Sequence, residues 1–192
     1  MEQVVLLTED GQARGTMDKA AVHHRDTPLH LAFSCYLFDG RGRLLLTTRA
    51  RTKPTWPGVR TNSCCGHPAP GEKLADAVRR RVPQELGVDA EEITLVLPAF
   101  RYRAVMENGI VENEMCPVFR AVTDGDPRPE PSEVDGYEWA VWDELVAEVG
   151  AGGRTVSPWC AQQVAELAAL GPDPFGWPAA DEALLPPAAR VA

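Results

Sequence analysis

The chain has 192 residues, of which 44% are hydrophobic and 24% are charged, and its formal net charge is -9. This length is enough for one domain with a sizeable core, and the composition is that of a globular protein rather than a disordered chain. The negative charge argues against a nucleic-acid partner, which needs a basic face, but a small phosphate ligand needs only a few cations.

The first predicted elements are strands. Val4 to Thr8 has a short β-like pattern that is closed by a turn around Asp10-Gly11. Leu31 to Asp39 is an apolar strand, and Arg43 to Arg49 returns as the second arm of a hairpin.

No apolar run approaches the roughly 18 residues that span a bilayer, and the acidic start of the chain is unlike a signal peptide. We therefore expect a cytoplasmic protein without a membrane partner.

A helix and two long β segments follow. Lys73 to Leu86 has helical periodicity, with Gly87 as its stop signal. Ile93 to Val105 and Ile110 to Val122 each have the pattern of one long strand, and Asn108-Gly109 between them is typical of a hairpin turn. These elements predict an α/β fold in which helices pack against a mixed sheet.

The last third contains a strand, two helices and a tail. Tyr137 to Trp142 is a strand, and Asp143 is placed to cap a short helix. Ser157-Pro158 is typical of an N-cap followed by a first-turn proline, and the helix that it opens is expected to run to about Leu170. We expect one domain over residues 1–170, and a Pro/Ala-rich tail over 171–192 that is loosely ordered.

The five cysteines favour free thiols. Their number is odd and no C-x-x-C pair occurs, which argues against a disulfide framework and against a cysteine-rich zinc site. Free thiols fit a reducing compartment, and one of them can act in catalysis. Cys64 and Cys65 are neighbours in an extended segment, so their side chains are expected to point in opposite directions.

The residues from Gly66 to Val88 resemble the Nudix box, G-x5-E-x7-R-E-U-x-E-E-x-G-U, where U is aliphatic. The spacing matches throughout, but Arg81 and Gln84 stand where the box has glutamate. Nudix hydrolases use these glutamates to hold divalent metals against a diphosphate, and here Glu85 is left nearly alone. One magnesium bridging Glu85 to a diphosphate stays compatible with the sequence, while Arg81 can meet a phosphate oxygen directly. Pro83 is expected to kink the last turn, and a surface helix with solvated charges is the alternative interpretation.

Three histidines and two glutamates form a candidate metal-ligand set. His23, His30 and His67 lie in segments rich in polar residues, and Glu112 and Glu114 lie two apart in a β-like run. Residues two apart in a strand point to the same face, and two adjacent carboxylates repel each other unless a cation neutralises them. Taken singly, each histidine is more typical of an ordinary surface or hydrogen-bonded residue.

The surrounding sequence is similar to the type 1 isopentenyl-diphosphate delta-isomerase family of the Nudix superfamily, over roughly Val4 to Trp159. The segments that carry this resemblance are, in order, His23…Asp26-Thr27…Leu29-His30-Leu31-Ala32-Phe33-Ser34, Trp56-Pro57-Gly58-Val59, Thr61-Asn62-Ser63, Cys65-Gly66-His67-Pro68, Glu85-Leu86-Gly87-Val88, Phe100-Arg101-Tyr102-Arg103-Ala104, Val111-Glu112-Asn113-Glu114, Cys116-Pro117-Val118-Phe119 and Ser157-Pro158-Trp159. The resemblance implies a Nudix-like fold and the conversion of isopentenyl diphosphate to dimethylallyl diphosphate through a carbocation. The partner is then a small diphosphate substrate, and the protein is expected to be a monomer or a weak dimer.

The resemblance also implies a role for each candidate residue. The metal ligands are His23, His30, His67, Glu112 and Glu114, with manganese, magnesium or zinc as the ion, and ligand type does not choose between them. His24, beside His23, is then a surface residue. The substrate diphosphate is bound by Lys19, Arg49, Lys53 and Arg81, and by a magnesium ion that Glu85 holds.

The same resemblance implies the acid/base chemistry. Cys65 and Glu114 match the catalytic pair, and which of them protonates the alkene stays open. Tyr102 matches a tyrosine beside Glu114 that donates a hydrogen bond or relays a proton. Trp159 matches a tryptophan that faces the carbocation, a contact worth about 2 kcal/mol or more when it is buried. Read without the family, Tyr102 and Trp159 are core aromatic residues.

Two other functions compete with this interpretation. A Nudix hydrolase of a nucleoside diphosphate derivative shares the fold and the metal, but Arg81 and Gln84 argue against it and it has no need of Cys65. A non-catalytic Nudix-like module with a structural metal needs no acid/base pair, so Cys65 and Glu114 together argue against that function.

Overall fold

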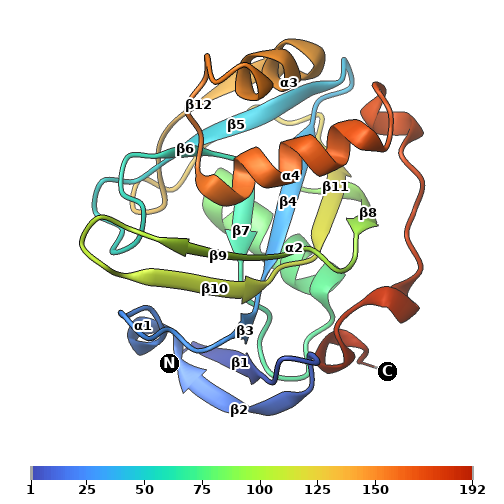
Figure 1. The fold of residues 1–192 in the computed structure, drawn as a ribbon. Helices are drawn as coiled ribbons and strands as arrows, with labels where there is room; N and C mark the ends of the chain where they lie inside the picture. The colour runs from blue at the N-terminus through green and yellow to red at the C-terminus, as the bar shows by residue number, and fades with distance from the viewer. Residues whose placement is uncertain (1, 192) are drawn as a thin grey trace.

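The computed structural model describes residues 2–191 and contains two β-sheets with helices packed around them (Figure 1). The strands are β1 Gln3–Leu7, β2 Ala13–Asp18, β3 His30–Leu31, β4 Phe33–Phe38, β5 Arg43–Arg49, β6 Arg60–Thr61, β7 Cys64–Gly66, β8 Glu91–Leu97, β9 Arg101–Val105, β10 Val111–Met115, β11 Val118–Val122 and β12 Val134–Val141. The helices are α1 Lys19–Val22, α2 Leu74–Leu86, α3 Trp142–Gly150 and α4 Pro158–Ala169.

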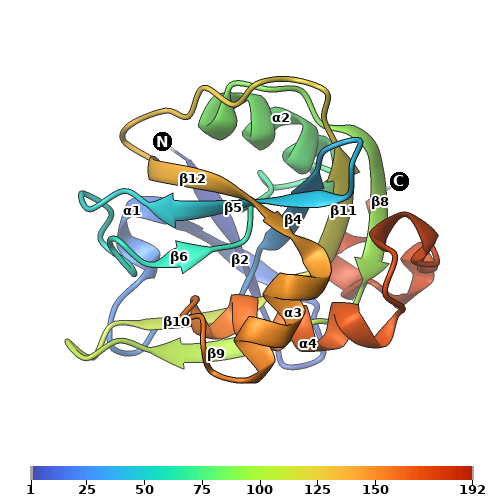
Figure 2. The same ribbon diagram turned by 90° about the horizontal axis from the view of Figure 1, so that it is seen from above.

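The strands form a smaller sheet in the order β2-β1-β3-β10-β9 and a larger one in the order β12-β5-β4-β11-β8, where β6 pairs with β5 and β7 with β4. The pairs β3·β10 and β4·β11 are parallel, and the other pairs are antiparallel. Figure 2 shows α2 on one face of the larger sheet and α3 and α4 on the other. The predicted α/β arrangement of mixed sheets and flanking helices is confirmed.

The strand β4 is buried along its whole length because helices cover both faces of its sheet. Phe33 and Leu37 pack into the core that α2 contributes to, while Tyr36 and Phe38 pack into the core formed with α3 and α4. This alternation is the two-residue period of a strand, applied to a strand with two apolar faces. The two cores therefore lie on opposite sides of one sheet.

Helix α2 forms where the sequence predicts it. It begins at Leu74, one residue after the expected start, and runs through Pro83 to Leu86 as a single element. Gly87 ends it in the left-handed conformation with φ 66°, and its N–H donates to the carbonyl of Pro83 at 3.0 Å. A Cβ at Gly87 would lie 2.5 Å from the carbonyl oxygen of Arg128, so this C-cap requires glycine.

Two segments predicted as single strands are each divided between the sheets, and here the prediction was wrong. Ile93 to Val105 contains β8 of the larger sheet and β9 of the smaller one, and Ile110 to Val122 contains β10 and β11. Pro98 and Pro117 lie at the two breaks, where a residue without an N–H interrupts the ladder. The hairpin at Asn108-Gly109 is confirmed, since β9 and β10 pair across it.

The predicted strand Leu31 to Asp39 is also divided, because the chain passes from β3 to β4 at Ala32. The neighbouring crossing, between β10 and β11, lies beside it: the Ala32 N–H donates to the carbonyl of Met115 at 2.9 Å, and the Ser34 N–H donates to that of Pro117 at 3.0 Å. Both parallel pairs therefore change sheet at the same place.

The starts of α3 and α4 test two capping predictions. Ser157 is the N-cap of α4, and its side chain accepts a hydrogen bond from the Cys160 N–H at 3.3 Å, as predicted. Asp143 is not the cap of α3: the N-cap is Val141, the last residue of β12, and it makes no side-chain cap. Because β12 leads directly into the helix, Asp143 falls in the first turn, where its negative charge interacts favourably with the positive end of the helix dipole.

The segment after α4, which we expected to be loosely ordered, lies against the domain in three 3-10 helices, Pro174–Gly176, Glu182–Leu184 and Pro187–Ala189. Its apolar residues explain the contact: Trp177 packs into the core of α3 and α4, and Leu185 into the core of α2. In Figure 1 it runs from α4 to the smaller sheet. Across residues 2–191, no helix is both long and apolar enough to cross a membrane.

Candidate active site

Three histidine rings from separate segments converge on one carboxylate oxygen. His23 follows α1, His30 lies in β3 and His67 follows β7. Their Nε2 atoms lie 3.8, 3.3 and 3.3 Å from Oε1 of Glu114 in β10. One potential ligand atom from each of the four residues lies within 4.8 Å of the others. This cluster is compatible with a metal site.

The donor atoms of the cluster fit a divalent cation. The buried Nε2 atoms of His23 and His30 have no hydrogen-bond partner among the described residues. Nδ1 of His30 lies 2.9 Å from the carbonyl of Pro28, so the ring proton belongs on Nδ1 and the Nε2 lone pair faces Glu114. Imidazole lone pairs beside a carboxylate form the mixed nitrogen and oxygen donor set that such ions bind.

Glu112 lies beside Glu114 on the same face of β10, as the strand periodicity predicts. The Tyr102 hydroxyl lies 2.9 Å from an oxygen of each carboxylate and thereby links the two. Burial raises the pKa of Glu112, and the neighbouring charge of Glu114 raises it further. Glu112 is outside the group of four that meet within 4.8 Å.

The electrostatics of the cluster favour a charged carboxylate and a neutral His67. Burial acts to raise the pKa of Glu114, but the three histidines outweigh it and hold that pKa well below its ordinary value. Burial lowers the pKa of His67 to about 4, against the opposing effect of Glu114. At neutral pH, Glu114 and His67 are therefore in the protonation states that a cation needs.

A cavity of about 630 Å³ brings most of the predicted site residues together. All of them line it except His30 and Glu85, which lie buried behind the wall. His24 is exposed, as expected. The opposite orientation of the paired cysteines is confirmed, because Cys64 packs into the core of α2 while Cys65 lines the cavity. Burial raises the pKa of the Cys65 thiol to about 11.

Aromatic rings form one wall of the cavity. The Tyr102 and Trp159 rings lie 5.5 Å apart between centroids, and the guanidinium of Arg49 lies 5.8 Å from the Trp159 ring centroid. Arg49 donates to the Thr55 carbonyl at 2.9 and 3.1 Å and to its hydroxyl at 3.0 Å. The guanidinium is therefore fixed in place before any ligand enters.

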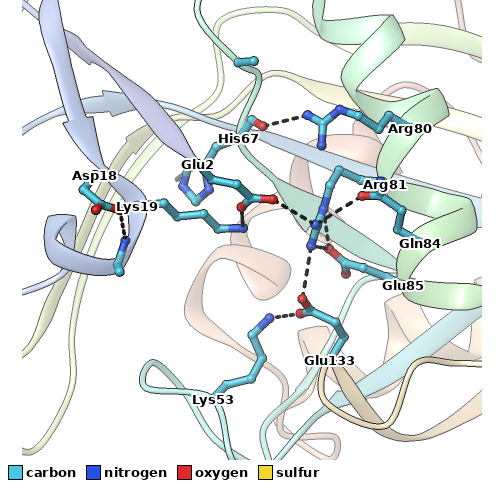
Figure 3. A network of polar contacts seen from close by, with 12 residues as sticks. Glu2, Asp18, Lys19, Lys53, His67, Arg80, Arg81, Gln84, Glu85 and Glu133 are labelled. Carbon is cyan, nitrogen blue, oxygen red and sulfur yellow. Dashed lines mark hydrogen bonds and ion pairs between the residues drawn. The ribbon is translucent and has the colours of Figure 1, made fainter.

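Three of the four predicted phosphate-binding cations, Lys19, Lys53 and Arg81, line the cavity and lie in an ion-pair network (Figure 3). Arg81 pairs with Glu85 behind it and lies 3.3 Å from Glu133, which also pairs with Lys53. Glu2 lies 2.6 Å from Lys19 and 3.8 Å from Arg81. The network comprises the pairs Arg81–Glu85, Arg81–Glu133, Lys53–Glu133, Lys19–Glu2 and Arg81–Glu2.

Helix α2, which carries most of the Nudix box, is held in place by two residues that match the box, Glu72 and Arg80. Arg80 donates to both carboxylate oxygens of Glu72 at 2.7 Å and to the carbonyl of His67 at 3.3 Å. The pair therefore fixes the loop that carries one cluster histidine. Gln84, the second departure from the box, accepts a 3.4 Å hydrogen bond from Arg81.

Sequence reasoning missed Glu2 and Glu133, which line the cavity and pair with its cations. Glu2 precedes the first strand and Glu133 ends a proline-rich connection, so neither belongs to a periodic pattern or a motif. The sequence shows only that they are acidic, and because acidic residues are common in this chain, that did not single them out.

Comparison with known proteins identifies relatives over the whole length. A NUDIX domain model matches residues 28–160. An isopentenyl-diphosphate Delta-isomerase of Saccharopolyspora erythraea is 64% identical over 192 residues, covering 100% of this chain and 99% of the relative. The enzyme of the same name from Rhizobium rhizogenes is 54% identical, covering 99% of this chain and 91% of the relative.

Solved structures share the fold at low identity. A Deinococcus radiodurans crystal structure matches with a TM-score of 0.65 and 20% identity, covering 86% of this chain and 98% of that one. A MutT protein of Methanosarcina mazei matches with a TM-score of 0.58 and 18% identity, covering 75% of this chain and 96% of that one. At these identities the likeness concerns the arrangement of the chain alone.

Proposed function

The chain belongs to the isopentenyl-diphosphate Delta-isomerases of the Nudix domain family, and from this we propose that it converts isopentenyl diphosphate to dimethylallyl diphosphate in isoprenoid biosynthesis, with Cys65 and Glu114 as its acid/base pair. One observation supports the assignment of the pair: a thiol and a hydrogen-bonded carboxylate line the same cavity as the cations that a diphosphate needs. A hydrolase has no use for such a thiol.

The isomerisation requires that the substrate gain one proton at one carbon and lose one proton from another. Protonation of the terminal alkene carbon gives a tertiary carbocation, and loss of a proton from the adjacent methylene gives the product. Cys65 and Glu114 exchange these protons with the substrate, and they take opposite parts in the two directions of the reaction. The Tyr102 hydroxyl, at 2.9 Å from Glu114, holds the carboxylate and can pass a proton to it.

Burial and aromatic rings protect the cation between the two steps. Trp159 is 2% exposed and Tyr102 6% exposed, so their rings present a water-poor wall to the substrate. The face of an indole attracts a cation by about 2 kcal/mol or more when both are desolvated. Exclusion of water also prevents capture of the carbocation as an alcohol.

The metal ligands of this proposal are His23, His30, His67, Glu112 and Glu114. A divalent cation at this site, manganese, magnesium or zinc, would neutralise the paired carboxylates and orient Glu114. A neutral His67 and an ionised Glu114 are the forms in which the chain presents these two ligands.

The diphosphate-binding residues are Lys19, Arg49, Lys53 and Arg81, which line the same cavity. Three of them are paired with carboxylates of the chain, so a diphosphate must compete with Glu2 and Glu133 for them. A magnesium ion held by Glu85 would offset that competition by neutralising part of the substrate charge.

The test is a proton NMR time course of the purified, metal-loaded protein with isopentenyl diphosphate in deuterated water. Dimethylallyl diphosphate should appear, with deuterium entering the substrate pool. Cys65→Ala should abolish the conversion, whereas Cys64→Ala, whose side chain faces the opposite core, should retain it. Release of phosphate without movement of the double bond would instead indicate a hydrolase.

A further inference from the structure

A buried asparagine lies between two of the residues assigned to the reaction. Asn62 is fully buried in the link between β6 and β7. Its Nδ2 donates to the carbonyl of Cys35 in β4 at 3.2 Å and to that of Cys64 in β7 at 3.0 Å. Both amide protons are thereby used, and the opposite amide orientation would place oxygen against two carbonyl oxygens. The direction of the amide is therefore fixed.

The other end of this amide contacts the site. Oδ1 of Asn62 accepts from the Cys65 thiol at 3.2 Å, from the Trp159 indole N–H at 3.1 Å and from the Thr61 hydroxyl at 3.0 Å. Cys65 lies in β7 and Trp159 in α4, so residues almost a hundred positions apart are joined through one oxygen. Among residues 2–191, the Trp159 side chain makes no hydrogen bond other than this one to Asn62.

Helix α4 supports the thiol from a second side. Gln163 of α4 is fully buried, and its Nε2 donates to the Ser34 hydroxyl at 2.9 Å. That hydroxyl lies 3.4 Å from Sγ of Cys65. A buried polar network in which each of these groups has a partner is rigid, because any rotation leaves a desolvated group unpaired.

We propose that Asn62 is a positioning residue for the isomerisation: its amide oxygen fixes the direction of the Cys65 thiol relative to the indole ring of Trp159. The role rests on the proposed function, since it concerns the alignment of the proton-transferring thiol with the ring that faces the carbocation. Asn62 itself does not line the cavity, so its effect on the reaction passes through Cys65 and Trp159.

The test compares Asn62→Ala with Ser63→Ala in the metal-loaded enzyme. Ser63 is the matched control because it is equally buried, lies in the same link and also ties it to β4, by accepting from the Leu37 N–H at 2.8 Å. A misplacement of about 1 Å can cost about 100-fold in rate, so we expect kcat of Asn62→Ala to fall by roughly 10- to 100-fold. KM, and the Kd for inorganic pyrophosphate, should change by less than about twofold, because the cations are untouched.

A spectroscopic measurement distinguishes positioning from general loss of structure. The Trp159 indole N–H resonance, identified by its absence in Trp159→Phe, should shift in Asn62→Ala and stay in place in Ser63→Ala. Asn62→Asp offers a second comparison if the alanine variant does not fold. With its carboxyl neutral it keeps an oxygen toward Cys65 and Trp159 but loses a donor to the strand carbonyls, so it should keep kcat within a few-fold of wild type while losing stability.

Two results would overturn the proposal: a kcat of Asn62→Ala within about twofold of wild type, or an equal loss of kcat in Ser63→Ala or Asn62→Asp. Inactivity of the wild-type enzyme toward isopentenyl diphosphate is a separate outcome, because it would refute the proposed function and remove the reaction that Asn62 serves.

Discussion

Replacing Arg81 with methionine should destabilise the protein strongly because it leaves Glu85 as an unpaired buried charge. Arg81 is 8% exposed and Glu85 is 6% exposed, and two nitrogens of the guanidinium contact the carboxylate. Removing one partner of such a pair costs roughly 3–5 kcal/mol. For a domain of this size, each kcal/mol corresponds to about 2–4 °C, so Tm should fall by roughly 10 °C.

The double variant Arg81→Met/Glu85→Leu tests the reason for that loss. Removing both charges and filling the space with apolar atoms also removes the desolvation penalty, so most of the stability should return. Urea unfolding at pH 7 in metal-free buffer measures the free energy directly, without a contribution from bound metal. Arg79→Met on the exposed side of α2 is the control, since its partner Asp76 is also exposed.

The reasoning about the buried pair would be refuted by a single variant as stable as wild type, or by a double variant no more stable than the single one. Isomerase activity should be lost in both variants, because both lack a diphosphate-binding cation. Stability and activity therefore separate in the double variant, which distinguishes the role of the Arg81–Glu85 pair in folding from its role in substrate binding.

Three further predictions concern other parts of the molecule. Glu114→Gln should weaken Mn²⁺ binding by roughly 10-fold or more, measured by titration calorimetry, and should lower activity with it. Glu72→Gln should destabilise the protein by about 1 kcal/mol at pH 7 in urea titrations, and the difference should shrink progressively as the pH falls below 4.5. The hydrogen bond from Arg80 lowers the Glu72 pKa below 4.5, so this stabilisation is present above that pH and is lost as pH falls through the folded-state pKa. Trp177→Ala should cost roughly 3–5 kcal/mol by thermal unfolding, and the exposed Phe175→Ala should cost little.

Each of these has an outcome that would contradict it. Unchanged metal affinity in Glu114→Gln would show that the carboxylate is no ligand. A destabilisation by Glu72→Gln that does not shrink as the pH is lowered would show that charge is not its origin. A stable Trp177→Ala would mean that the tail contributes little to the core that it enters.

The elements of the fold that could be predicted have a strong local signal. The stripe and stop signal of α2, the Asn-Gly hairpin and the Ser-Pro start of α4 each depend on residues close in sequence. The division of Ile93 to Val105 between two sheets depends on which strands lie beside it, and that is long-range information. The cap of α3 failed for the same reason, since β12 continues directly into the helix.

The candidate site was predictable where a chemical type is rare. Histidine is rare in this chain, so three of its four histidines and the Cys-Gly-His segment were easy to select as candidates. The resemblance to a family then assigned each of them a role. Glu2 and Glu133 are ordinary acidic residues, and only the folded chain shows that they meet Lys19 and Lys53. The pairing of Arg81 with Glu85 was also not predicted, because both residues were assigned to the diphosphate, Arg81 directly and Glu85 through a magnesium ion.

The contact between the two ends of the chain has a consequence for the order of folding. The Ala188 N–H donates to the carbonyl of Gly11 at 2.9 Å, and a Cβ at Gly11 would lie 2.9 Å from Pro187. This joins residues separated by nearly the whole sequence, so its closure carries the loop entropy of almost the entire chain. During synthesis the hairpin of β1 and β2 emerges well before this partner, which is added only when the chain has been extended to residue 188. The seam between the termini should therefore form late, after both cores have consolidated, and should open first when the protein unfolds.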